Sequence, residues 1–153
     1  MVPGERIWAA AVALVGTPFR LHGRAPATGL DCVGLALAAC SEAGLWRDGA
    51  VATAAAPDRY RLQDNCSDWA ESWLAKLGLM RRPAEDAGVG DILLCRPSPR
   101  QLHLLIGGVG AHIHADAGLR RVVLTPGAPR MACLSRWRAA PLINLPLHAA
   151  AKE

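Results

Sequence analysis

The hydrophobic pattern of this sequence changes from a helical period to a strand period near Val89. Before that point, apolar residues recur three and four positions apart, and Gly16, Gly44 or Gly78 closes each stretch. After it, short apolar segments alternate with proline, glycine and polar turns, over residues 91–95, 102–106, 111–115, 120–124 and 142–145. Helices followed by strands are typical of α+β folds. We therefore expect N-terminal helices packed on a C-terminal antiparallel β-sheet.

The length and composition predict one globular domain over residues 1–153. A chain of this size buries a core without metal or disulfide support. The sequence is 52% hydrophobic and 20% charged, which excludes a disordered protein, and no apolar run is long enough to cross a membrane. Trp69 and Trp73 lie four apart in the third helical stretch and are expected in the core. Residues 45–65 are expected to be irregular and the most variable part.

Charge and cysteine content exclude several classes of protein. The net charge of +4 is mild, and the single Phe and single Tyr offer little base stacking, so no nucleic acid partner is expected. The five cysteines form no CxxC pair and predict no disulfide framework, which favours synthesis in a reducing compartment. Glu5 and Arg6 precede the apolar residues 7–15, so we interpret that segment as an amphipathic helix starting near Pro3, with no signal peptide and with cytoplasmic synthesis.

A cysteine stands at the predicted start of the second helix. Asp31 is a suitable N-cap, which places Cys32 in the first turn. The unpaired N–H groups of a helix start favour a thiolate there, so we expect a lowered pKa and faster alkylation of Cys32 than of the other cysteines. The alternative is that Cys32 is a small buried apolar residue, as most cysteines are.

The histidines of the strand region offer partners for such a thiol. Strand alternation places His103 on one face with Gln101 and Leu105, and a glycine-rich turn leads to a strand with His112 and His114 on one face. A hairpin brings one of these two beside His103. A cysteine nucleophile requires a base and a group that orients the base. A one-residue register error would exchange the roles of His112 and His114.

A zinc site is the alternative chemistry for these histidines. His103, His112 and His114, with Cys95 or Asp116 nearby, would form a ligand set on adjacent strands. That alternative leaves the Cys32 helix start without a function, so we expect no metal and no other cofactor.

Four segments of the sequence resemble motifs of the NlpC-type bacterial cell-wall peptidases, a papain-like cysteine peptidase family. Gly16-Thr17-Pro18-Phe19 resembles the family's G-T-P-Y segment, and Asp31-Cys32-Val33-Gly34 resembles its D-C-S-G nucleophile motif. Val89-Gly90-Asp91-Ile92 resembles its P-G-D-L strand start, and the strand from His103 to Gly107 resembles its H-V-G-I-Y strand. The order and spacing agree over residues 7–125.

The resemblance implies a papain-like α+β fold and a cysteine peptidase. It implies Cys32 as the nucleophile, His103 as the base and His114 as the orienting residue, acting on amide bonds of peptidoglycan stem peptides. Phe19 and Val33 depart from the family by lacking the hydroxyls of its tyrosine and serine. Candidate substrate-binding residues are Asp31, Phe19, Arg20, His22, Arg24 and His112.

Residues 20–24 also resemble the short peptidases encoded with phage tails and gene transfer agents. This resemblance implies phage-like tail or hub proteins as partners, and action in the periplasm or cell wall after incorporation into a particle. The alternative is a catalytically inactive structural component of a tail hub with the same fold.

Overall fold

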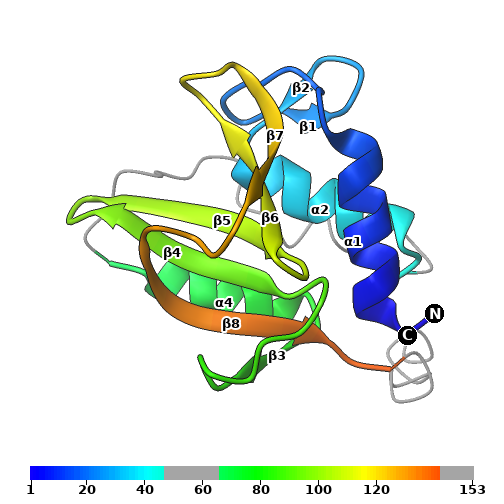
Figure 1. Ribbon diagram of the computed structural model, residues 1–153, viewed down its shortest axis with the longest axis vertical. Coiled ribbons are helices and arrows are strands. Elements are labelled where there is room, and N and C mark those ends of the chain that lie inside the picture. Colours follow the sequence, from blue (N-terminus) through cyan, green and yellow to red (C-terminus); the bar gives the residue numbers. More distant parts are fainter. Residues whose placement is uncertain (47–65, 142–153) are drawn as a thin grey trace, which may run out of the picture.

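The computed structural model describes residues 1–46 and 66–141 of the 153-residue chain. Helices precede strands along the chain, and two short strands lie between the first two helices (Figure 1). The elements are α1 (Pro3–Leu14), β1 (Arg24–Ala25), β2 (Gly29–Leu30), α2 (Cys32–Glu42), α4 (Asp68–Lys76), β3 (Leu79–Arg82), β4 (Ile92–Ser98), β5 (Gln101–Gly107), β6 (Ala111–Asp116), β7 (Arg121–Pro126) and β8 (Ala132–Ala139).

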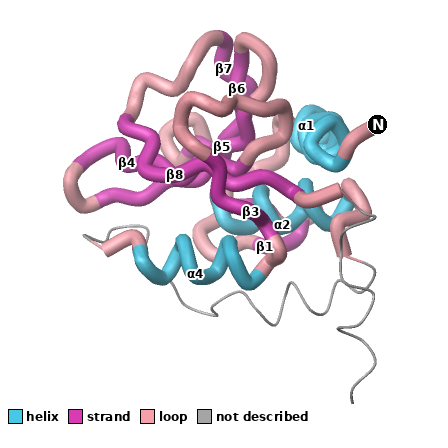
Figure 2. Tube along the Cα trace, turned by 90° about the horizontal axis from the view of Figure 1, so that it is seen from below, coloured by secondary structure: helices cyan, strands magenta, loops and turns pink. Residues whose placement is uncertain are grey.

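The strands from β3 to β8 form one antiparallel sheet in the order β3-β8-β4-β5-β6-β7. Helices α2 and α4 lie on the same side of this sheet, and α1 packs beside α2 (Figure 2). The expected α+β arrangement is therefore confirmed. No helix of the described residues has the length and apolar character that spanning a membrane would require.

The two faces of the sheet bury different clusters. On the helix side, Leu102, Leu104 and Ile106 of β5 pack into the main core together with α2, which is buried along most of its length. On the outer face, Leu93, Cys95 and Leu105 form a smaller cluster partly covered by Met131. The period of two along β5 thus separates its residues as the sequence predicts, and it places His103 with the outer face.

The start of α2 is held closely against the preceding loop. A Cβ atom at Gly34 would collide with the backbone carbonyl of Gly23, so only glycine fits at this position without a shift of the backbone. Because Gly34 is two residues from Cys32, this contact fixes where the helix start lies relative to the loop.

The sequence prediction missed β3 and β8. In β8, Trp137 and Ala139 are buried whereas Arg136 and Arg138 alternate with them, and the buried position before Trp137 is a serine, Ser135. Because of these two arginines and the serine, the sequence of β8 lacks the apolar alternation of a strand, although β8 lies between β3 and β4 in the sheet. The strand expected at 142–145 lies outside the described residues, as does nearly all of the segment 45–65. Trp73 is buried and Trp69 packs against the core, as expected.

Candidate active site

The first turn of α2 begins at a buried capping carboxylate. Asp31 is the N-cap, and its side chain accepts hydrogen bonds from the backbone N–H of Gly34 (2.9 Å) and of His22 (2.8 Å). Asp31 is fully buried. The carboxylate therefore ties the loop to the helix start, a structural role, and the candidate substrate contact by Asp31 is not what the geometry provides.

Cys32 is the first residue of α2 and is only 1% exposed. Burial and, second, the Asp31 carboxylate raise the pKa of the Cys32 thiol to about 12. Backbone hydrogen bonds at Leu104 of β5 and at Val33 and Cys32 of the helix start act in the opposite direction, but they are the smaller influence. The expected lowering of the pKa is therefore wrong, because desolvation and a neighbouring anion outweigh the helix N-terminus.

A histidine pair lies on the two strands next to this helix start. His103 Nε2 and His114 Nδ1 are 3.0 Å apart, with the rings perpendicular. The second ring nitrogen of His114, Nε2, lies 3.5 Å from Thr125 Oγ1 on β7. The register pairs β5 with β6 only at Ile106–Ile113 and Gly107–His112, so the two histidines meet beyond the last paired residues. The prediction that a hairpin brings a second histidine beside His103 is confirmed, and the neighbour is His114.

Both histidines of this pair are held neutral. Burial, together with the nearby His114 and His112 rings, lowers the pKa of His103 to about 4, although the Asp116 carboxylate acts in the opposite direction. Burial and His112 likewise lower the pKa of His114, again against Asp116. At neutral pH the site thus combines an uncharged thiol with an uncharged imidazole.

Cys32 and the two histidines line one cavity of about 260 Å³. Its other described lining residues are Phe19, Pro97, Gln101, Leu102, Ala115, Asp116, Ala117, Gly118 and Met131. The structure therefore brings together four of the predicted site residues, Cys32, His103, His114 and Phe19. Gln101 was not among the predicted site residues, although it lies two positions before His103 on the same strand face. No feature of the sequence would have predicted Met131 as a lining residue, because it lies in the segment between β7 and β8.

The remaining candidates lie elsewhere. His112 is buried, stacks on His114 with ring centroids 5.6 Å apart, and its Nδ1 lies 3.0 Å from the carbonyl oxygen of Gly127. It thus contacts His114, and it lines a different cavity. Arg20 and His22 are exposed and Arg24 is half-buried. None of these four residues is among the described lining of the Cys32 cavity.

The zinc alternative is not supported by the arrangement of these side chains. Within residues 1–46 and 66–141, no three His, Cys, Asp or Glu side chains are grouped so that they could hold a metal ion. His103 and His114 instead direct ring nitrogens at each other, and His112 directs one at a backbone carbonyl.

Solved structures similar to this one are NlpC/p60 proteins. NlpC1 from Trichomonas vaginalis matches with a TM-score of 0.64 at 20% identity, over 90% of this chain and 44% of that chain. The P60 domain of an antigen from M. avium subspecies paratuberculosis matches at 0.55 and 18% identity, over 90% and 94%. The peptidoglycan hydrolase RipB from Mycobacterium tuberculosis matches at 0.53 and 19% identity, over 90% and 64%.

These comparisons settle the fold. This chain spans less than two thirds of the NlpC1 and RipB chains. No protein-family model and no curated protein matches the sequence. The NlpC-type, papain-like α+β fold expected from the sequence motifs is nevertheless confirmed: the chain has the fold of NlpC/p60 domains.

Proposed function

We propose that this protein is a cysteine peptidase that hydrolyses amide bonds in peptidoglycan stem peptides. The observation that carries the proposal is the cavity that is lined both by Cys32, at a helix start, and by His103, which is hydrogen-bonded to His114. The substrate class rests on the sequence motifs and on the likeness of fold to a peptidoglycan hydrolase. In this proposal Cys32 is the nucleophile, His103 the base and His114 the residue that orients the base.

The hydrogen bonds of the histidine pair support one nitrogen of His103 as the base in this proposal. If His114 donates its Nε2–H to Thr125 Oγ1, its Nδ1 accepts the Nε2–H of His103. His103 Nδ1 then carries the free lone pair and takes the thiol proton. Such an alignment matches the general arrangement of a base held by a third group.

The protonation states indicate when the thiolate forms. With the pKa of Cys32 raised and that of His103 lowered, a resting thiolate–imidazolium pair is disfavoured. The proton therefore moves from Cys32 Sγ to His103 Nδ1 as the sulfur attacks the bound carbonyl carbon. The Cys32 backbone N–H at the helix start contributes to stabilising the oxyanion. The protonated His103 then gives its proton to the leaving amine, and water hydrolyses the thioester.

The test is digestion of purified sacculi and stem peptides of several peptidoglycan types, followed by mass spectrometry. Wild type is expected to release peptide fragments that Cys32→Ala does not. Cys40→Ala is a matched control, because Cys40 is also buried on α2 with its pKa raised to about 12, but it is absent from the cavity lining. Equal fragment release by wild type and Cys32→Ala would overturn the proposal.

A non-catalytic tail-hub component is the second candidate function. The observation that favours it is the near-complete burial of Cys32 in a cavity whose lining also includes Phe19, a residue without a hydroxyl group. This candidate predicts no Cys32-dependent fragment from any peptidoglycan type. The sacculus digestion therefore distinguishes the two.

The proposal extends to the place of action. The segment Arg20–Arg24 resembles phage-tail and gene-transfer-agent peptidases, so we propose association with a phage-like tail, and action in the periplasm or cell wall after delivery by that particle. Copurification of the protein with tail particles from its host tests this association. Recovery only as free protein from particle-producing cells would contradict it.

A further inference from the structure

We propose that Cys95 and Cys133 form a redox-active thiol pair in addition to the proposed active site. A hydroperoxide converts this pair into a cross-strand disulfide on the outer face of the sheet. This inference goes beyond the proposed peptidase activity and does not depend on it.

The strand register places the two cysteines opposite each other. Cys95 of β4 pairs with Cys133 of β8, whereas the preceding pair is Leu94 with Ser135, so a bulge at Leu134 separates the two pairs. Without that extra residue, Cys95 would face Leu134. Directly opposed residues of antiparallel strands have Cα atoms about 4.5 to 5.5 Å apart, which lies within the range that a disulfide bridges. The bulge therefore creates the pairing.

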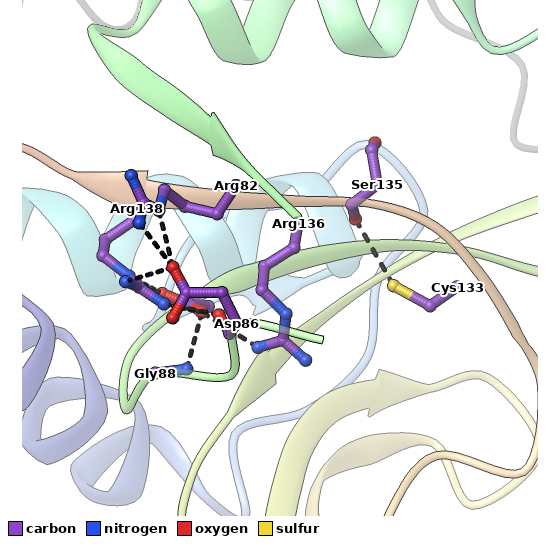
Figure 3. Close-up of polar contacts among 8 residues, drawn as sticks. Arg82, Asp86, Gly88, Cys133, Ser135, Arg136 and Arg138 are labelled. Atoms are coloured by element: carbon purple, nitrogen blue, oxygen red, sulfur yellow. Dashed lines mark hydrogen bonds and ion pairs between the residues drawn. The ribbon is translucent and has the colours of Figure 1, made fainter. Parts of the chain in front are cut away.

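The two thiols influence each other. Their side-chain hydrogen bonding raises the pKa of Cys95 and lowers the pKa of Cys133. The Cys133 thiol in turn donates to the backbone carbonyl of Ser135 at 3.5 Å, and Figure 3 shows the sulfur directed at that group.

The pair has the asymmetry of an attacking and a resolving thiol. Cys133 is exposed, whereas Cys95 is fully buried. The hydrogen bond from Cys95 and the charge of Arg136 lower the pKa of Cys133, whereas the pKa of Cys95 is raised. Oxidants react with accessible thiolates. Cys133 is therefore the thiol that meets the oxidant, and Cys95 is the thiol that completes the bond.

The reaction balances with one hydroperoxide. The Cys133 thiolate attacks the peroxide oxygen, which breaks the O–O bond and leaves a sulfenic acid on Cys133 and one hydroxide or alkoxide. The Cys95 sulfur then attacks the Cys133 sulfur, and the sulfenic oxygen leaves as water with the Cys95 proton. Two thiols lose one electron each, and the peroxide accepts both.

The disulfide would form beside the base of the proposed active site. Cys95 pairs with Cys133 on one side and with His103 of β5 on the other, so the three residues form one row across β8, β4 and β5. Cys32 is buried on the helix side of the sheet and has a raised pKa. Mild oxidation is therefore expected to link the two cysteines of this row and to leave Cys32 reduced.

The test is peptide mapping of the native, full-length protein after treatment with an equimolar amount of hydrogen peroxide. Free thiols are blocked with iodoacetamide, and the digest is analysed without reduction. We expect a cross-linked peptide joining Cys95 to Cys133 that has lost two hydrogen atoms. In Cys95→Ala, we expect a sulfenic acid on Cys133 that dimedone traps and that wild type does not accumulate.

Three outcomes would overturn the proposal. These are a sulfinic acid on Cys133 without any link in wild type, oxidation of the exposed Cys66 as fast as that of Cys133, and a dimer linked through Cys133 as the main product. If Cys95→Ala does not fold, Cys133→Ser serves instead, because its site is exposed. That variant must show no link and an unmodified Cys95, and oxidation of Cys95 in it would also contradict the assigned order of reaction.

Discussion

Cys32 and Cys133 are two thiols in opposite environments within the same fold. Cys32 begins a helix and is buried, with its pKa raised to about 12 by desolvation and by Asp31. Cys133 lies on a strand and is exposed, with its pKa lowered by Cys95 and by the nearby Arg136. The thiol at the proposed active site is thus the one with the smaller thiolate fraction.

The difference teaches that intrinsic thiol reactivity and catalytic competence are separate properties. A low pKa makes a thiol reactive towards any electrophile in solution. A thiol with a raised pKa reacts only when a base is positioned to take its proton, and in the proposed mechanism that base is His103, which lines the same cavity. On this proposal, burial protects Cys32 from oxidants until substrate binds. Four predictions test this contrast.

The largest effect is expected from removing the buried nucleophile. Cys32→Ala is expected to lower kcat/KM for peptide release by about 10⁴-fold, because it removes the covalent step. Cys133→Ser should leave kcat/KM within about twofold, since Cys133 is absent from the described cavity lining. Kinetics on a defined stem peptide measure both. A loss in Cys133→Ser comparable with that in Cys32→Ala would abolish the distinction.

In alkylation of the protein without substrate, we expect the larger effect at Cys133 and the smaller at Cys32. Iodoacetamide at neutral pH is expected to label Cys133 at least about tenfold faster than Cys32, because labelling requires an accessible thiolate. This reverses the expectation from sequence. Mass spectrometry of tryptic peptides over a time course gives both rates, with the other exposed cysteine, Cys66, as the reference. Preferential labelling of Cys32 would show that its thiolate forms without substrate.

The fold is predictable where hydrophobic periodicity dominates. The capped start at Asp31 and the strand alternation around His103 are strong local signals, and both are confirmed. Strand β8 is not predictable in this way, because its inward positions include Ser135 and its outward positions are arginines. The buried carboxylate of Asp91 explains this departure. It accepts hydrogen bonds from Arg136 and Arg138, pairings that arise 45 and 47 residues apart in sequence.

Some features of the candidate site could likewise be predicted from the sequence, and others could not. The residues themselves predict Cys32, His103 and one of His112 and His114, and the family resemblance selects His114. The structure brings Cys32, His103 and His114 to one cavity. The protonation state of Cys32 could not be predicted, because burial and the orientation of Asp31 arise only after folding. The opposed pair of Cys95 and Cys133 also escapes prediction from sequence, since a single bulge residue decides it.

The buried base proposed for Cys32, His103, predicts how stability and activity change in acid. The pKa of His103 is lowered from 6.5 to about 4 in the folded protein. The unfolded chain therefore binds more protons between these values, and the free energy of unfolding falls as pH falls from about 6.5 to about 4. The loss from this residue is at most about 3 kcal/mol. Activity should fall over the lower part of the window, because protonated His103 accepts no proton.

Urea unfolding at a series of pH values measures this loss. In His103→Gln the decrease between about pH 6.5 and 4 should become smaller by the His103 contribution, with His114 retaining its own. Peroxide oxidation of Cys133 needs no histidine base, so its rate in this variant should match wild type. An unchanged pH dependence of unfolding in His103→Gln would show that His103 is not held neutral by burial.

The smallest effect is expected at the far end of the histidine pair. Thr125→Val removes the hydroxyl that lies 3.5 Å from His114 Nε2, a long and therefore weak hydrogen bond, so kcat should fall by only about two- to fivefold. Thr28→Val is the matched control, because the exposed Thr28 hydroxyl bonds only to the nearby carbonyl of Ala25. If Thr125 fixes the His114 tautomer, the loss appears in kcat rather than KM, and Cys133 oxidation stays unchanged. A change in KM with no change in kcat, or an equal loss of kcat in Thr28→Val, would show that the His103–His114 hydrogen bond orients the base without help from β7.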